Sequence, residues 1–292
     1  MARCNAAGTG IYFAAMGQFS EEESSVGRYY DGPIYEGEIT RLPRDCPVEF
    51  AITCRWLERL ATSGMMVAEI GVGGAHYTEI LARKGCRLHL VDVSERLLES
   101  AVRRLQDAGL ERQIVAVHHE SGAQLAGLEP ASVDLTLLLG PLYHLRSPED
   151  RRHCVRESAR ILKPGGTLLA AGINRLSYLR DLFRESPLQA SQRRAFHDEY
   201  LRDGNLDPEH APPIGYAHLT TIAEFRASFE GLFEEQALVG AESFTTAWQK
   251  KFGELPLAER EAEAWLDLVE QTGNTPEGLA QSDHFLFVGR KL

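Results

Sequence analysis

The hydrophobic pattern along this chain alternates between short, nearly continuous apolar runs and longer segments in which apolar residues recur at helical spacing. The runs predict strands at the start of 66–75 and at 87–91, 113–118, 133–139 and 167–171. The helical spacing predicts helices at 76–84, from Ser94 to near Gly109, and from Ser147 to the turn at 163–166. Such alternation is typical of an α/β fold whose parallel strands are joined by helical crossovers.

The segment after this core follows a different pattern. Residues 173–220 have Arg, Tyr, His and Pro in place of the aliphatic runs, so we expect a substrate cover inserted between strands five and six. Beyond it we predict a helix opened by the capping box of Thr221 and Glu224, a strand at 234–240, a helix at 256–272 with Trp265 on its inner face, and a last strand at 284–289.

The segment before the core divides into two parts. Residues 1–27 are rich in Gly, Ala, Ser and Glu without a sustained period, which predicts a disordered tail. Residues 28–64 form a predicted N-terminal cap, with a helix signalled by Pro47 and closed by Gly64. The main domain is then expected to span residues 65–292.

Composition and charge narrow the classes of partner. The 292 residues are 43% hydrophobic and 25% charged, as in ordinary globular proteins. A formal net charge of -11 argues against nucleic acid as a partner. No apolar run approaches the roughly 18 residues of a membrane span, so no membrane partner is expected. The five cysteines are odd in number and lack C-x-x-C spacing, which indicates a reducing, cytoplasmic location without a disulfide framework or zinc site.

A glycine-rich turn joins the first predicted strand to its helix. Such a turn at a helix N-terminus presents backbone N–H groups and the positive end of the helix dipole to a ligand. The dinucleotide fingerprint needs a small residue where this chain has His76, so it is not met. The chain instead has an acidic-x-Gly-x-Gly pattern made of Glu69, Gly71 and Gly73.

With Asp92, which ends the second strand 21 residues after Gly71, this pattern resembles the class I S-adenosylmethionine-dependent methyltransferases. The Lys-Pro-Gly-Gly turn at 163–166, just before the fifth strand, is a second match. The resemblance implies a doubly wound, Rossmann-like α/β fold with seven mostly parallel strands in the order 3-2-1-4-5-7-6. It covers about residues 65–172 well and 220–292 in outline.

The resemblance also implies how S-adenosylmethionine is held. The turn with Glu69, Gly71 and Gly73 lies against the methionine part, and the carboxylate of Asp92 accepts both ribose hydroxyls through charge-assisted bonds. The alternative for Asp92 is a solvated aspartate at a strand end with no binding role. Further residues are expected around the cofactor on the same resemblance: Val93, Ser121, Gly122, Leu139 and, from the cap, Tyr30. An ordinary packing role is the alternative for Tyr30.

The loop after the third strand departs from the family pattern, which usually has an aspartate for the adenine amino group. Glu120 or Ser121 stands near that position, and backbone groups around Gly122 are another possible source of the contact. His118, His119 and Glu120 do not predict a metal site, because adjacent strand residues point to opposite faces and no spaced partner completes a ligand set. We therefore expect no metal.

The loop 139–145 follows the fourth strand, where this family brings the acceptor to the methyl group. Its Gly-Pro-Leu-Tyr-His-Leu sequence resembles small-molecule methyltransferases related to the quinone-ring methylating group. His144 is the first candidate for a general base because imidazole titrates near neutral pH, and Tyr143 is a second candidate. A histidine that only hydrogen-bonds the loop backbone is the rival interpretation.

The expected reaction is an in-line displacement in which a small-molecule acceptor attacks the methyl carbon of S-adenosylmethionine. Two alternatives stay open on the sequence alone. One is a protein of the same fold that binds S-adenosylmethionine without chemistry, and the other is a nicotinamide-dependent oxidoreductase. His76 and the Lys-Pro-Gly-Gly turn both argue against the oxidoreductase.

Overall fold

A seven-stranded sheet forms the centre of the molecule in the computed structural model, which describes residues 17–32, 34–212 and 214–292. Its strands lie in the order β3-β2-β1-β4-β5-β9-β8, and β9 is antiparallel to both neighbours. The bounds are β1 (Met66–Ile70), β2 (Arg87–Asp92), β3 (Ile114–His119), β4 (Val133–Leu138), β5 (Leu162–Ile173), β8 (Phe233–Gly240) and β9 (His284–Lys291). The predicted fold class and strand order are confirmed.

Both faces of the sheet are covered by helices, so successive strand residues enter two different hydrophobic cores. Val67 packs into one core and Ala68 into the other, and both are fully buried. The first core adds residues of α3 (Pro47–Leu60), α4 (His76–Arg83) and α5 (Glu95–Asp107). The second adds residues of α6 (Pro148–Ile161) and α10 (Ile222–Ala227). This two-sided burial explains the continuous apolar runs in the sequence.

The N-terminal part is helical earlier than the composition suggested. Helix α1 (Glu21–Asp31) begins inside the segment predicted as a disordered tail. A capping box explains its start, because the Glu23 N–H donates to Ser20 Oγ and the Ser20 N–H donates to the Glu23 carboxylate. Helices α2 (Tyr35–Asp45) and α3 follow within the predicted cap. The prediction for residues 1–16 lies outside the described residues.

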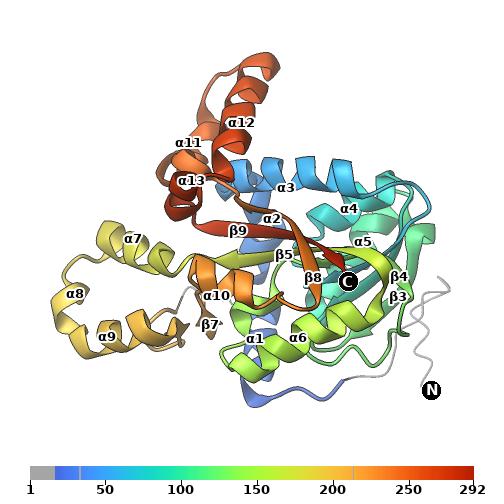
Figure 1. Cartoon of the computed structure of the whole chain (residues 1–292), viewed down its shortest axis with the longest axis horizontal. Coiled ribbons are helices and arrows are strands. Elements are labelled where there is room, and N and C mark those ends of the chain that lie inside the picture. The colour runs from blue at the N-terminus through green and yellow to red at the C-terminus, as the bar shows by residue number, and fades with distance from the viewer. Residues whose placement is uncertain (1–16, 33, 213) are drawn as a thin grey trace.

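The predicted cover between β5 and β8 forms a small unit with its own core. It contains α7 (Arg175–Glu185), α8 (Gln189–Gln192), α9 (Arg194–Asp203), β6 (Asn205–Leu206) and β7 (Ala217–His218). Tyr200 is fully buried in this core, and its hydroxyl donates to the Arg175 carbonyl. Figure 1 shows α7 to α9, in yellow, projecting beside the sheet.

A second insertion lies between β8 and β9, at the top of Figure 1. It contains the short helix η3 (Ser243–Trp248) and the helices α11 (Gln249–Glu254), α12 (Glu259–Gly273) and α13 (Pro276–Gln281). Leu266 and Val269 of α12 are buried, but Trp265 is 45% exposed. The expectation that Trp265 faces inward is therefore wrong. The buried face of α12 is narrower than the face that its apolar residues would cover at helical spacing.

The described residues include no helix with the length and apolar character that crossing a membrane requires. Two further short helices connect sheet elements, η1 (Glu111–Gln113) before β3 and η2 (Pro141–His144) after β4. The four described cysteines, Cys46, Cys54, Cys86 and Cys154, are free thiols.

Candidate functional site

The glycine turn after β1 has a backbone that favours glycine. Gly71 has a φ of +84° and Gly73 a φ of +47°, both in the left-handed region. A Cβ atom on Gly71 would lie 2.9 Å from Cδ of Pro141, so a side chain there would also collide with the loop after β4. The turn and this loop can approach each other only because residue 71 is glycine.

A cleft of about 960 Å³, partly open to solvent, lies at the carboxyl edge of the parallel strands. Its floor comes from the glycine turn and from the ends of β2, β3 and β4, and α1 and α2 supply its roof. The structure brings these sequence-predicted residues into its wall: Tyr30, Gly71, Gly73, Asp92, Val93, Ser121, Gly122, Leu139, Tyr143 and His144. Glu69 is the one predicted site residue that does not line the cleft.

Asp92 joins the end of β2 to the glycine turn. Its carboxylate accepts the Val72 N–H at 2.9 Å and the Ser94 N–H at 2.8 Å. The side chain is buried, and burial raises the pKa of Asp92 to about 6 although these backbone bonds lower it. Asp92 therefore places a carboxylate, with spare acceptor capacity, in the wall of the cleft.

Glu69 points away from the cleft into the packing between β1 and α4. Its Oε2 atom accepts the Thr78 hydroxyl at 2.6 Å, and both residues are buried. Burial raises the pKa of Glu69 to about 8, so its neutral acid form predominates at neutral pH. A cofactor role for Glu69 stays a prediction, and the geometry favours a bond that ties the helix to the strand.

We expect Glu69→Gln to change the affinity for S-adenosylhomocysteine by no more than about threefold, because a neutral amide reproduces the neutral acid. Glu69→Leu leaves the Thr78 hydroxyl without its partner and should lower the free energy of unfolding by about 1–3 kcal/mol. Calorimetric titration and urea denaturation measure the two effects. A tenfold loss of affinity in the Gln variant would show instead that Glu69 serves the ligand.

The loop after β3 contacts the roof of the cleft. The Ser121 hydroxyl donates to the carboxylate of Glu23 on α1 and accepts the Ala123 N–H at 3.0 Å. Glu120 accepts the Gly127 N–H at 3.1 Å, so its carboxylate is engaged within its own loop. Gly122 fits closely, since a Cβ there would lie 3.1 Å from Ile70 and Pro141 atoms.

His144 lies in η2, and both of its ring nitrogens have partners. Nδ1 is 2.9 Å from the carbonyl oxygen of Tyr216, which can only accept, so Nδ1 carries the proton. Nε2 is then an acceptor, and the Tyr30 hydroxyl lies 2.9 Å from it. Burial lowers the pKa of His144, which keeps the ring neutral. The structure thus aims an unprotonated nitrogen at a hydroxyl across the cleft.

Tyr143 lies beside His144 but has a different set of contacts. Its hydroxyl donates to the Leu139 carbonyl at 3.0 Å, and burial raises its pKa. A phenol held in this way contributes its ring to the wall, and its acid–base role stays a prediction.

A charged pair on α2 was missed by sequence reasoning. Arg41 donates from Nε to the Glu38 carboxylate at 2.8 Å, and both residues line the roof of the cleft. Glu38 is only 8% exposed, which is unusual for an acidic residue. The available signal was the i,i+3 spacing of opposite charges within the predicted N-terminal cap.

The histidines at the end of β3 have separate partners. His118 Nε2 lies 3.0 Å from His89 Nδ1, and His119 Nε2 lies 3.0 Å from the Val93 carbonyl oxygen. Since the two rings bond to different neighbours, as strand alternation predicts, they do not converge on a common point.

Comparisons with known proteins relate this chain to methyltransferases. The sequence model described as a methyltransferase domain matches residues 68–170, which run from β1 to β5. The chain is 27% identical over 218 residues to the ubiquinone biosynthesis O-methyltransferase of Methylococcus capsulatus, covering 70% of this chain and 87% of that protein. The enzyme of the same description from Cupriavidus pinatubonensis is 33% identical over 123 residues, covering 41% of this chain. The chain spans only 46% of that second relative.

A solved structure shares the fold. The N-methyltransferase NodS from Bradyrhizobium japonicum, in complex with S-adenosyl-L-homocysteine, has a TM-score of 0.51 and 17% identity. The match covers 88% of this chain and 95% of that chain. At this identity the likeness shows the common fold alone.

Proposed function

We infer that this chain, an S-adenosylmethionine-dependent methyltransferase, transfers a methyl group to a hydroxyl on the ring of a small aromatic acceptor. The methyltransferase domain match and the O-methyltransferase relatives support the reaction class. The choice of a hydroxyl as acceptor rests on the neutral His144 ring, whose unprotonated Nε2 accepts a phenolic hydroxyl, that of Tyr30.

The residues of the cleft fit S-adenosylmethionine. The left-handed glycine turn lines the cleft, and the Asp92 carboxylate faces the cleft where two ribose hydroxyls would donate to it. Arg41 in the roof offers a guanidinium suited to the methionine carboxylate. When bound, the cofactor supplies an electrophilic methyl carbon and a good leaving group.

The acceptor hydroxyl would take the place of the Tyr30 hydroxyl at His144 Nε2. As its oxygen forms the new bond to the methyl carbon and the bond from that carbon to sulfur breaks, its proton passes to Nε2. The Tyr216 carbonyl, bonded to Nδ1–H, orients the ring and stabilises the imidazolium that results. The products are the methyl ether and S-adenosylhomocysteine.

Alignment and exclusion of water are the other tasks of the protein. The candidate residues stand at strand ends and in the turns that follow them, and α1 and α2 cover them. In favourable intramolecular cases such positioning lowers a barrier by about 7–11 kcal/mol. The burial of His144 and the partial burial of Tyr143 in this wall are consistent with a reaction centre that excludes water.

The test is transfer of a labelled methyl group from S-adenosylmethionine to a panel of catechols, hydroxybenzoates, primary amines and thiols. We expect label in methyl ethers of the phenols. Label found only in amines or thiols would overturn the choice of oxygen, whereas tight cofactor binding without transfer to any acceptor class or to a metabolite extract would favour a non-catalytic binding protein.

Thermal stabilisation by candidate ligands tests which cofactor the chain binds. S-adenosylhomocysteine should raise the melting temperature by several degrees, because at 100 times its dissociation constant a ligand stabilises the folded state by about 2.7 kcal/mol. NAD and NADP should leave it unchanged. Differential scanning fluorimetry gives both answers, and stabilisation by the nicotinamide nucleotides alone would contradict the assignment.

A further inference from the structure

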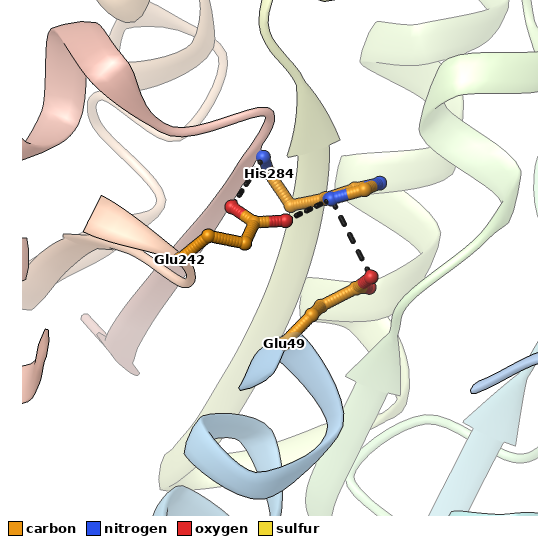
Figure 2. A group of neighbouring side chains, drawn as sticks. All are labelled: Glu49, Glu242 and His284. Atoms are coloured by element: carbon orange, nitrogen blue, oxygen red, sulfur yellow. Dashed lines mark hydrogen bonds and ion pairs between the residues drawn. The ribbon is translucent and has the colours of Figure 1, made fainter. Parts of the chain in front are cut away.

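Three ionisable side chains from distant parts of the sequence meet outside the cleft wall. Glu49 lies in the first turn of α3, Glu242 just after β8, and His284 at the start of β9. Figure 2 shows the two carboxylates pointing at the same imidazole ring from different elements. We call these three residues the Glu-Glu-His cluster. Sequence reasoning missed it, because Glu49 is far from Glu242 in the sequence and the second insertion separates Glu242 from His284.

The distances in the cluster are short. His284 Nδ1 lies 2.5 Å from Glu242 Oε1 and 3.4 Å from Glu49 Oε2, and the His284 backbone N–H donates to Glu242 Oε2 at 3.0 Å. The three candidate ligand atoms all lie within 4.8 Å of one another. An ion about 2.0–2.2 Å from each, as zinc requires, therefore needs only small side-chain movements.

Burial makes this arrangement costly without a further positive charge. The Glu242 side chain is fully buried, and Glu49 Oε2 is a shielded oxygen that accepts no hydrogen bond within the described chain. Of the nearby charges, Arg41 is paired with Glu38 and also acts on Glu49 from a distance, and Asp283 is paired with Arg180. With both carboxyl groups ionised against one imidazolium, the cluster would carry a net negative charge, and burying such a charge is unfavourable.

We propose that the Glu-Glu-His cluster binds a divalent transition-metal ion through Glu49 Oε2, Glu242 Oε1 and His284 Nδ1. The ion replaces the proton on Nδ1, so two carboxylates and a neutral imidazole balance its two positive charges. Imidazole favours zinc and other late transition metals, and carboxylates also accept manganese. Three protein ligands leave a coordination position for water.

The position of the cluster between three elements means that metal binding can be measured through the thermal stability of the protein, independently of enzymatic turnover. The ion joins α3, which packs on the first core, to the ends of β8 and β9. Because an ion that binds only the folded chain stabilises it by mass action, zinc or manganese should raise the melting temperature of the whole protein.

The experiment uses the full chain stripped with a chelator and then dialysed against Zn²⁺ or Mn²⁺, with bound metal measured by inductively coupled plasma mass spectrometry. We expect a single ion per chain, and at least tenfold weaker binding in Glu49→Gln and His284→Gln. The matched control is His210→Gln, which removes another imidazole–carboxylate pair, that of His210 with Asp207 at 2.9 Å. It should bind the ion as the unchanged protein does.

Two results would overturn the proposal. One is a chain that retains neither metal after dialysis, and the other is equal binding by Glu49→Gln and the control. Glu49 is the decisive position, since its removal takes away the carboxylate oxygen that lacks a hydrogen bond and leaves the Glu242–His284 pair intact. S-adenosylhomocysteine binding and circular dichroism verify that each variant is folded, and Glu49→Ala replaces any Gln variant that is not.

Discussion

Asp92→Asn is expected to weaken the binding of S-adenosylhomocysteine about 100-fold, because two charge-assisted bonds to the ribose become neutral at a cost of about 1.5 kcal/mol each. The protein should stay folded with a modest loss of stability, since the amide keeps the shape of the side chain but its nitrogen cannot accept one of the two backbone N–H groups that the carboxylate accepts. Isothermal titration calorimetry measures the affinity and thermal denaturation the stability. Unchanged affinity with a large loss of stability would show that Asp92 only anchors the glycine turn.

The same carboxyl group predicts a pH dependence. The folded-state pKa of Asp92 is raised to about 6, above its ordinary 3.8, so the folded chain takes up a proton before the unfolded chain does. Its contribution to stability therefore increases as the pH falls through this range, whereas the charged form that binds ribose is lost. We expect the dissociation constant to rise toward tenfold per pH unit below about 6. Asp92→Asn should not show this rise.

His144→Ala is expected to lower kcat by about 10²–10⁴-fold, the usual contribution of a positioned general base. Affinity for S-adenosylhomocysteine should change little. Since burial lowers the pKa of His144, the acid limb of the pH–rate profile should lie below the ordinary value of a histidine, and the variant should lack that limb. Methyl transfer to the best phenolic acceptor of the panel is the assay.

Tyr30→Phe is the matched control for His144. It removes the hydroxyl that bonds Nε2 but leaves the ring and the base, so most of kcat should remain. If His144→Ala retains full turnover, or loses cofactor affinity and turnover in parallel, the histidine serves to hold Tyr30 and the Tyr216 carbonyl in place.

The sheet could be predicted from the sequence because its signals are local. Each strand of the core is a nearly continuous apolar run, and the glycine turn after β1 marks the point where the chain approaches Pro141 closely. Helix α1 was predictable as well, since Ser20 and Glu23 form a capping box by their spacing, but the polar composition around them outweighed it. Trp265 shows the opposite error, because helical spacing alone does not say how wide the buried stripe is.

Site geometry was less predictable because it depends on contacts between distant segments. Tyr30 and His144 were each chosen from family position, but the bond between them joins residues 114 positions apart. Glu69 occupies the motif position yet turns toward Thr78, since a strand residue faces whichever layer the sheet packing assigns it. The Glu-Glu-His cluster depends on the pairing of β8 with β9, which no spacing in the sequence reveals.

The reversed direction of β9 has a consequence for how such a protein can be diversified. Ile173 at the end of β5 pairs with His284, and Gly240 at the end of β8 pairs with Phe285, so both insertions leave the sheet at one edge. That edge also holds the cleft. Segments as large as 174–220 and 243–281 therefore leave the sheet on the side of the cleft, where loops can vary in length and sequence while the strands keep their register.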